Sequence, residues 1–166
     1  MSFLSGAEAV APAHIIKLAQ NAPSPRVAIA RAGARLPMLA AKEAFEANMM
    51  VPIFTGERDM IEAEAEALDW DISGFELIEA TGEVESGMAA AKLCGEGHAD
   101  VLMKGQLHTD NFMRAAVSRD NGLRTGKRFV HIFHITKGDE SITISDAAVN
   151  VAPDFDTRKD ATREVV

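Results

Sequence analysis

The fold of this chain is decided by residues 27–54, which have the sequence VAIARAGARLPMLAAKEAFEANMMVPIF. The stretch begins and ends with short apolar runs, Val27–Ala30 and Val51–Phe54, of the kind found in strands that are covered on both faces. Between them, Pro37 stands near the first turn of an alanine-rich segment, a position where its missing N–H costs nothing. We therefore expect a strand, a helix ending at about Glu46, and a second strand parallel to the first.

The same alternation continues along the chain in both directions. The expected further helices are 7–20, 57–68, 84–95, 109–118 and 156–166, and the further strands are 75–78, 99–103 and a hairpin pair, 128–135 and 141–145, turning about 137–139. Four strand–helix units in succession predict a three-layer α/β/α fold with a mostly parallel sheet. Ligands of such folds bind beyond the carboxyl ends of the strands, which directs attention to the loops that follow them.

Composition and charge exclude several classes of function. The chain has 166 residues, 47% of them hydrophobic, and a net charge of −8 from 17 basic and 25 acidic side chains. A strongly acidic chain is a poor candidate for sequence-independent binding of nucleic acid or for docking on an anionic membrane surface. The single cysteine, Cys94, excludes an internal disulfide and agrees with a cytoplasmic location. No apolar run reaches the roughly 20 residues of a membrane span, and the first residues lack the basic segment of a secretory signal.

The charge is unevenly distributed along the chain. Residues 57–100 have a net charge of about −11, whereas residues 101–137 have about +5. A locally basic stretch in an acidic protein favours a small anionic ligand over a polyanion.

Several common site motifs are missing from the sequence. There is no phosphate loop of the form G-x-x-x-x-G-K-[ST], no H-E-x-x-H and no G-x-S-x-G. Gly95-Glu-Gly97 follows a predicted helix and precedes a strand, the reverse of the order that pyrophosphate binding requires. His131 and His134 are three residues apart on a predicted strand, so they lie on opposite faces and cannot share a metal ion there. We expect no metal site and no bound cofactor.

Two of the four candidate site segments lie between residues 104 and 114. Lys104 and Gly105 end a predicted strand, where a lysine presents a cation to the ligand-binding edge and a glycine lets a ligand approach the backbone. His108 and Thr109 precede a helix that Thr109 can cap, and the free N–H groups of its first turn can bind an anion. Arg114 follows on that helix. An exposed loop lysine and an ordinary ion pair between Asp110 and Arg114 remain as alternatives.

The other two candidate segments lie further along the chain. Arg124 stands between two glycines in Gly122-Leu-Arg-Thr-Gly126, and an arginine can bind a phosphate through two hydrogen bonds. Asp146 and Asn150 follow the second hairpin strand, either as the edge of a site or as an Asx turn. A plain flexible turn is the alternative for Arg124. The four segments together indicate a ligand that carries phosphate.

The motif series resembles a known family. VLMKGQLHTDNFMRAA (residues 101–116), GLRTG (122–126) and SDAAVNVAPD (145–154) occur in the order found in the phosphate acetyl/butyryltransferase family, and the chain is closer to the butyryltransferase branch. The resemblance extends from about Ala11. It implies the reaction acyl-CoA + phosphate = acyl phosphate + CoA, with coenzyme A as a substrate. It also implies a two-domain fold of the isocitrate/isopropylmalate dehydrogenase-like type, an active site in the interdomain cleft and a homodimer.

The resemblance assigns roles to residues of this chain. Thr109 and Arg114 match the hydroxyl and arginine that position phosphate or the acyl phosphate, and they are the catalytic candidates. Arg124 matches a contact for phosphate or for the CoA pyrophosphate. The remaining binding candidates are Lys104, Gly105, His108, Asp146 and Asn150. His108 stands where butyryltransferases often have serine, and Arg31 and Arg35 stand where members of the family often have acidic residues.

The largest departure from the family is length, because family chains are roughly twice as long. The acid–base aspartate and the neighbouring Ser-Arg pair of the family lie in the second half, so no general base can be named here. We expect an N-terminal fragment that is inactive alone, with one α/β domain over residues 1–124 and the beginning of a second over 125–166. The alternatives are a stand-alone regulatory domain that binds CoA or acyl phosphate and a metal- and NAD-dependent decarboxylating dehydrogenase.

Overall fold

The computed structural model describes residues 12–137, 140–146, 149–150 and 152–165. The chain forms two compact units: the first ends at Arg124, and the second begins at Thr125. The N-terminal unit contains α1 (Ala13–Gln20), β1 (Arg26–Ala30), α2 (Arg35–Glu46), β2 (Val51–Gly56), α3 (Arg58–Ala67), β3 (Glu76–Glu79), α4 (Gly82–Gly95), β4 (Val101–Lys104) and α5 (Thr109–Ala116). The C-terminal unit contains β5 (Phe133–Lys137), β6 (Glu140–Ile144) and α6 (Phe155–Val165).

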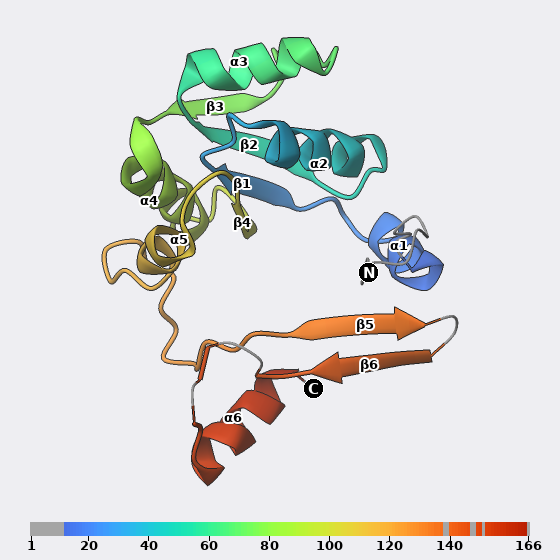
Figure 1. Ribbon diagram of the computed structural model, residues 1–166, viewed down its shortest axis with the longest axis vertical. Coiled ribbons are helices and arrows are strands. Elements are labelled where there is room, and N and C mark those ends of the chain that lie inside the picture. The colour runs from blue at the N-terminus through green and yellow to red at the C-terminus, as the bar shows by residue number, and fades with distance from the viewer. Residues whose placement is uncertain (1–11, 138–139, 147–148, 151, 166) are drawn as a thin grey trace, which may run out of the picture. The chain divides into compact units, whose positions relative to one another are not determined.

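The four strands of the N-terminal unit form one parallel sheet in the order β3-β2-β1-β4 (Figure 1). The predicted α/β class and parallel pairing are therefore confirmed. Alternate residues of β1 face two cores. Val27 and Ile29 pack with residues of α2 and α3, whereas Ala28 and Ala30 pack with residues of α4. This explains why the strand sequences are continuous apolar runs: each is covered on both faces.

The structure shortens some of the predicted elements. Pro12 stands at the N-cap of α1. A proline has no N–H to donate and its ring clashes with a helical turn before it, so it suits the position just before a helix. Residues 7–11 of the predicted helix lie outside the described residues. β5 begins at Phe133 instead of 128. It pairs antiparallel with the five residues of β6, and an isolated two-stranded ribbon is only as long as its shorter strand. The predicted turn residues Gly138 and Asp139 also lie outside the described part.

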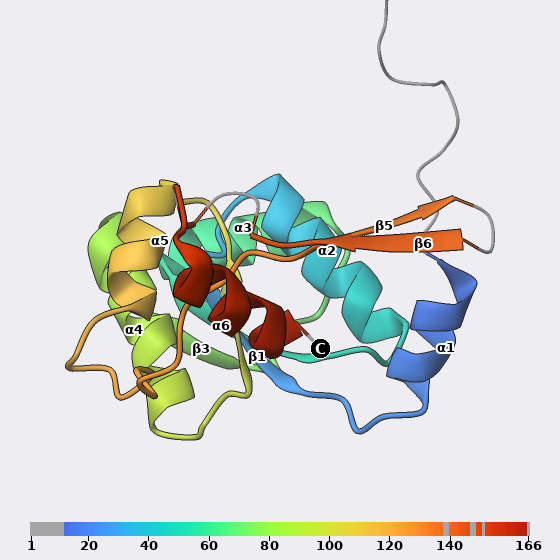
Figure 2. The same cartoon turned by 90° about the horizontal axis from the view of Figure 1, so that it is seen from below.

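Gly95, the last residue of α4, has a packing role. A Cβ on Gly95 would lie only 1.5 Å from the carbonyl oxygen of Asn121, so only glycine allows α4 to approach the loop that follows α5. α4 and α5 accordingly lie side by side in both views (Figures 1 and 2). The absence of a side chain at Gly95 is therefore explained by packing within the protein.

Candidate functional site

The candidate site lies at the carboxyl edge of the parallel sheet. Strand order reverses at β1, because β2 and β3 extend to one side of it and β4 lies on the other. The carboxyl ends of β1 and β4 therefore flank the topological switch point, where open α/β sheets bind ligands. Arg31 follows β1 at this point, and Gly105 follows β4.

The chain itself fills the space beside Gly105. The Gly105 N–H donates to Ala30 O at 2.9 Å, and the Gln106 N–H donates to Arg31 O at 2.9 Å. A Cβ on Gly105 would lie 2.4 Å from both of these carbonyl oxygens. We expected this glycine to admit a ligand to the backbone. The close approach that it permits is instead made by the protein's own β1–α2 connection.

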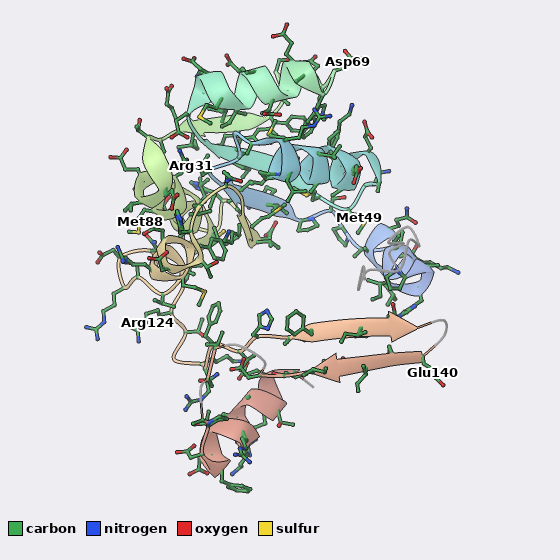
Figure 3. All side chains as sticks on the ribbon, in the orientation of Figure 1. Arg31, Met49, Asp69, Met88, Arg124 and Glu140 are labelled. Carbon is green, nitrogen blue, oxygen red and sulfur yellow. The ribbon has the colours of Figure 1, made fainter. Side chains whose placement is uncertain are left out.

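Arg31 has three partners at this edge. Its guanidinium donates to both carboxylate oxygens of Glu57 at 3.3 and 3.2 Å and to Gln106 O at 3.3 Å, and it lies 3.6 Å from a carboxylate oxygen of Glu83. Its side chain is 23% exposed. Figure 3 shows Arg31 where β1 ends, beside α4. Two carboxylates of the protein therefore neutralise this cation.

Glu83, in the first turn of α4, holds the beginning of α5. It accepts hydrogen bonds from the His108 N–H and from Asn111 Nδ2, both at 2.8 Å, and its carboxylate lies 2.8 Å from Nδ1 of His108. The backbone hydrogen bond from His108, followed by the side chains of Asn111 and His108, lowers the pKa of Glu83 to about 2. The carboxylate therefore remains ionised at the positive end of α5.

Glu57 pairs with the beginning of α4, as Glu83 pairs with the beginning of α5. It accepts a hydrogen bond from the Gly82 N–H at 2.9 Å, and the hydrogen bond from Arg31 lowers its pKa. We call Arg31, Glu57, Glu83, His108 and Asn111 the strand-end network. It joins the ends of β1, β2 and β4 to the beginnings of α4 and α5, and it places a carboxylate of the protein at each helix N-terminus.

Sequence reasoning missed Arg31, Glu57 and Glu83 as members of one cluster. Arg31 and Glu57 each directly follow a strand, and Glu83 begins the helix after the third strand. The rule that sites lie beyond strand ends pointed to these loops. Their mutual pairing required the strand order, which local patterns do not contain.

The predicted cap of α5 was wrong. The helix begins at Thr109, its N-cap is His108, and no side chain of the cap residue makes a capping hydrogen bond. The capping is done by Glu83 from a different element, a contact separated by 25 residues in sequence. Thr109 is therefore the first helical residue.

The three predicted cations of the N-terminal unit are exposed. Lys104, Arg114 and Arg124 make no hydrogen bond or ion pair with any residue in the described ranges, and the alternative pair between Asp110 and Arg114 does not form there. Figure 3 shows Arg124 on the loop that follows α5. These side chains are thus uncompensated, in contrast to Arg31.

Asp146 and Asn150 lie together in the C-terminal unit. Asp146 accepts hydrogen bonds from the N–H groups of His131 (3.1 Å), Val149 (3.2 Å) and Asn150 (2.9 Å), and the Asn150 side chain also contacts this carboxylate. Asn150 Nδ2 donates to Phe129 O at 3.0 Å. The local bonds are those of an Asx-type turn.

Asp146 and Asn150 also line a pocket of about 450 Å³, together with Thr143, Ser145, Pro153, Thr157, Arg158, Ala161, Thr162 and Val165. The two predictions for this segment, a turn and the edge of a site, are therefore compatible.

Two further properties concern the described residues as a whole. Among them, no group of three or more His, Cys, Asp and Glu side chains is placed to hold a metal ion. No helix in the same part of the chain combines the length and apolar character needed to cross a membrane.

Comparison with known proteins gives consistent results. No protein-family model matches the sequence. The chain is 33% identical over 138 residues, 82% of its length, to a phosphate butyryltransferase of Clostridium beijerinckii, of which this covers 46%. It is 29% identical over 131 residues, 78% of its length, to a phosphate acetyltransferase of Rickettsia typhi, covering 38% of that protein. The chain thus spans about half or less of the length of the curated relatives that it matches.

Solved structures show the same fold. The EutD phosphotransacetylase of Staphylococcus aureus superposes with a TM-score of 0.70 at 21% identity, over 87% of this chain and 53% of that one. A phosphotransacetylase of Streptococcus pyogenes gives 0.67 at 13% identity, over 84% and 52%.

The architecture is therefore the α/β fold of the phosphotransacetylases. In sequence, the chain is similar to the phosphate butyryltransferases and phosphate acetyltransferases, so the resemblance that its motifs indicate is confirmed.

Proposed function

We propose that this chain contributes half of a phosphate acyltransferase, which interconverts acyl-CoA plus phosphate with acyl phosphate plus CoA. The observation that supports this function best is the 33% identity to a phosphate butyryltransferase across 82% of the chain. The exposed, uncompensated cations, among them Lys104 at the end of β4, agree with it, since phosphate and CoA are both anionic.

Lys104, Arg114 and Arg124 are the proposed contacts for phosphate and for the CoA pyrophosphate. Arginine provides two parallel donors to a phosphate, and cations stabilise the negative charge that develops on the reacting phosphoryl and carbonyl oxygens. The hydroxyl of Thr109 and the exposed ring of His108 complete this group. CoA attacks efficiently only as a thiolate, so a base must assist it, and we assign that base to the other half.

Residues 125–166 are proposed to begin the second domain of an isocitrate/isopropylmalate dehydrogenase-like fold, with Asp146 and Asn150 at the domain junction. Cross-strand pairs place Phe133 opposite Ile144 and Ile135 opposite Ile142, and all four side chains are exposed. A two-stranded ribbon with an exposed apolar face is typical of a domain whose hydrophobic core is completed by additional residues. The complete enzyme is proposed to be a cytoplasmic homodimer without a bound cofactor.

The first test is the release of CoA from butyryl-CoA in the presence of phosphate. We expect the 166-residue chain to show almost no turnover alone, and a complete protein containing it to be active. Robust phosphate-dependent turnover by the isolated chain would contradict the proposal that it lacks part of the active site.

The second test concerns Arg114 in the complete protein. Arg114→Ala should raise the activation free energy by about 2–4 kcal/mol, the scale of losing one donor to a developing oxyanion. Arg119→Ala, which removes another exposed cation just beyond α5, is the matched control and should leave catalytic efficiency unchanged. A loss below about threefold for Arg114→Ala would remove Arg114 from the site.

A further inference from the structure

Glu83 has more partners than any other carboxylate at the carboxyl edge of the sheet. It contacts Arg31 after β1 and both His108 and Asn111 at the beginning of α5. Its side chain is only 20% exposed, although it lies at a sheet edge. A carboxylate with this many donors is fixed in one orientation, because moving it would leave several donors unpaired.

These contacts restrain the segment that bears the proposed phosphate contacts. The connection from β4 to α5 runs from Lys104 to His108, and it is anchored at one end by the backbone bonds of Gly105 and Gln106 to the β1 end. At its other end it is anchored by Glu83, through the His108 N–H and the Asn111 side chain. The direction of α5, and hence the location of Arg114, depends on both anchors.

Leu107 adds an apolar anchor between the two. It is buried in the core formed with α4, and Ala115 of α5 packs against Gly87 of the same helix. These contacts keep α5 against α4. The polar groups at the beginning of α5, the His108 N–H and the Asn111 side chain, are held by Glu83.

We propose that Glu83 is a positioning residue, which orients the β4–α5 connection and α5, and with them the exposed cations Lys104 and Arg114 that we assign to phosphate binding. The inference rests on the proposed function for the identity of the ligand. Glu83 acts through His108 and Asn111, and it does not itself contact the substrate.

The same geometry gives Glu83 a second consequence. The His108 N–H is already paired with the Glu83 carboxylate, so a phosphate beside α5 does not receive a hydrogen bond from this group. We therefore expect phosphate to bind the exposed cations without a hydrogen bond from the His108 N–H.

The test is a titration of the 166-residue chain with inorganic phosphate, followed by NMR of backbone and side-chain groups, combined with amide hydrogen exchange. In the wild type we expect phosphate to shift the signals of Lys104 and Arg114 and to leave the His108 amide unchanged. In Glu83→Ala we expect the exchange protection of the His108 amide to fall about tenfold and the phosphate affinity to fall at least about fivefold. Glu83→Gln, whose amide oxygen still accepts the His108 N–H, should restore both to within about threefold of the wild type.

Glu57→Ala is the matched comparison for a loss of stability. It removes the other carboxylate partner of Arg31 and a bond to Gly82, but it touches no residue of α5. It should therefore lower stability while preserving the exchange protection of the His108 amide. Equal loosening of that amide in Glu57→Ala and Glu83→Ala would overturn the positioning role, because the effect would then be a general loss of stability.

The outcomes separate the inference from the function on which it rests. If phosphate causes no shift in the wild type, Lys104 and Arg114 do not bind phosphate in this half by itself, and the exchange data still test whether Glu83 restrains the beginning of α5. If phosphate binds the wild type and Glu83→Ala equally well, the positioning role is wrong. A phosphate-induced shift of the wild-type His108 amide would contradict the pairing of that N–H with Glu83 in the phosphate-bound chain.

Discussion

At Gly105 the chain has room for a hydrogen atom on Cα and for nothing larger. An added Cβ would meet two backbone oxygens, Ala30 O and Arg31 O, at 2.4 Å, and backbone cannot rotate away as a side chain can. Gly105→Ala should therefore lower the free energy of unfolding by about 1–3 kcal/mol, as measured by urea denaturation. Gly74→Ala is the control, because nothing lies within 4 Å of the added methyl group. It should leave stability unchanged or raise it by up to about 1 kcal/mol. Equal stability of the two variants would contradict the packing described at the switch point.

Glu83 also makes stability depend on pH. Its pKa is about 2 in the folded chain, against an ordinary value of 4.5. Because the folded value is the lower one, its stabilising contribution is fully present above about pH 4.5 and is lost as the pH falls from there toward about 2. Glu83→Gln should therefore lose less stability than the wild type between pH 6 and pH 3, as compared through urea midpoints.

The control for this prediction is Glu62→Gln. Glu62 is an exposed carboxylate on α3 whose ion pair with Arg58 joins neighbouring turns of one helix. Exposed pairs of this kind contribute little, so the variant should follow the wild type at both pH values. Parallel pH profiles for Glu83→Gln and the wild type would show that Glu83 has no depressed pKa.

At the scale of elements, a single hydroxyl joins β1, β2 and α4. Thr55 is fully buried, and its Oγ1 lies within hydrogen-bond distance of Ile29 O (3.0 Å) and Ser86 O (2.9 Å). Thr55→Val preserves the shape of the side chain but removes the one proton that Oγ1 can donate, so one of these carbonyl groups loses its side-chain donor. The free energy of unfolding should fall by about 1–3 kcal/mol, the cost of a buried unpaired polar group. Calorimetry or urea denaturation measures this change.

Thr81→Val provides the comparison for Thr55→Val. Thr81 stands at the N-cap of α4, is exposed and makes no capping hydrogen bond with its side chain. Substitution at such a surface position should change stability by no more than about 0.5 kcal/mol. A loss for Thr55→Val that is no larger than this would show that its hydroxyl does not join α4 to the sheet.

At the scale of the whole molecule, the boundary between the two units is open to proteases. Residues 122–128 form no helix or strand, and Arg124, Lys127 and Arg128 in this segment are exposed. Limited digestion with trypsin should therefore produce a persistent fragment that ends at one of these three residues, as identified by mass spectrometry. Replacing all three with glutamine should slow its formation. Cleavage within β1–β4 before any such fragment accumulates would contradict a separate N-terminal unit.

The order of elements in the N-terminal unit was predictable from the sequence. Apolar runs such as Val27–Ala30 and the intervening helical periodicity are local properties, so they define strands, helices and parallel pairing before any tertiary contact is known. Helix and strand ends were less predictable. α1 begins only after Pro12, later than its periodicity suggests, and β5 has the length that its partner strand allows.

The candidate site was predictable only in part. The motifs identified exposed cations such as Lys104 and Arg114, because a strand end and a helix start are visible in the sequence. The cap of α5 was not predictable, since it is provided by Glu83, which stands 25 residues before His108 in the sequence. Capping rules consider neighbours in sequence, whereas a carboxylate at a helix N-terminus can come from any element that the fold brings there.

The sequence by itself determined that this protein is an α/β chain with a parallel sheet, a locally basic stretch and a resemblance to the phosphate acyltransferases. Only the tertiary structure decided the strand order β3-β2-β1-β4, and with it the location of the switch point. That order brings Arg31 to two carboxylates, Glu57 and Glu83, that lie 26 and 52 positions further along the chain. The physical reason is that periodicity fixes each element through neighbouring residues, whereas the side chains at a sheet edge meet only after the strands have been ordered.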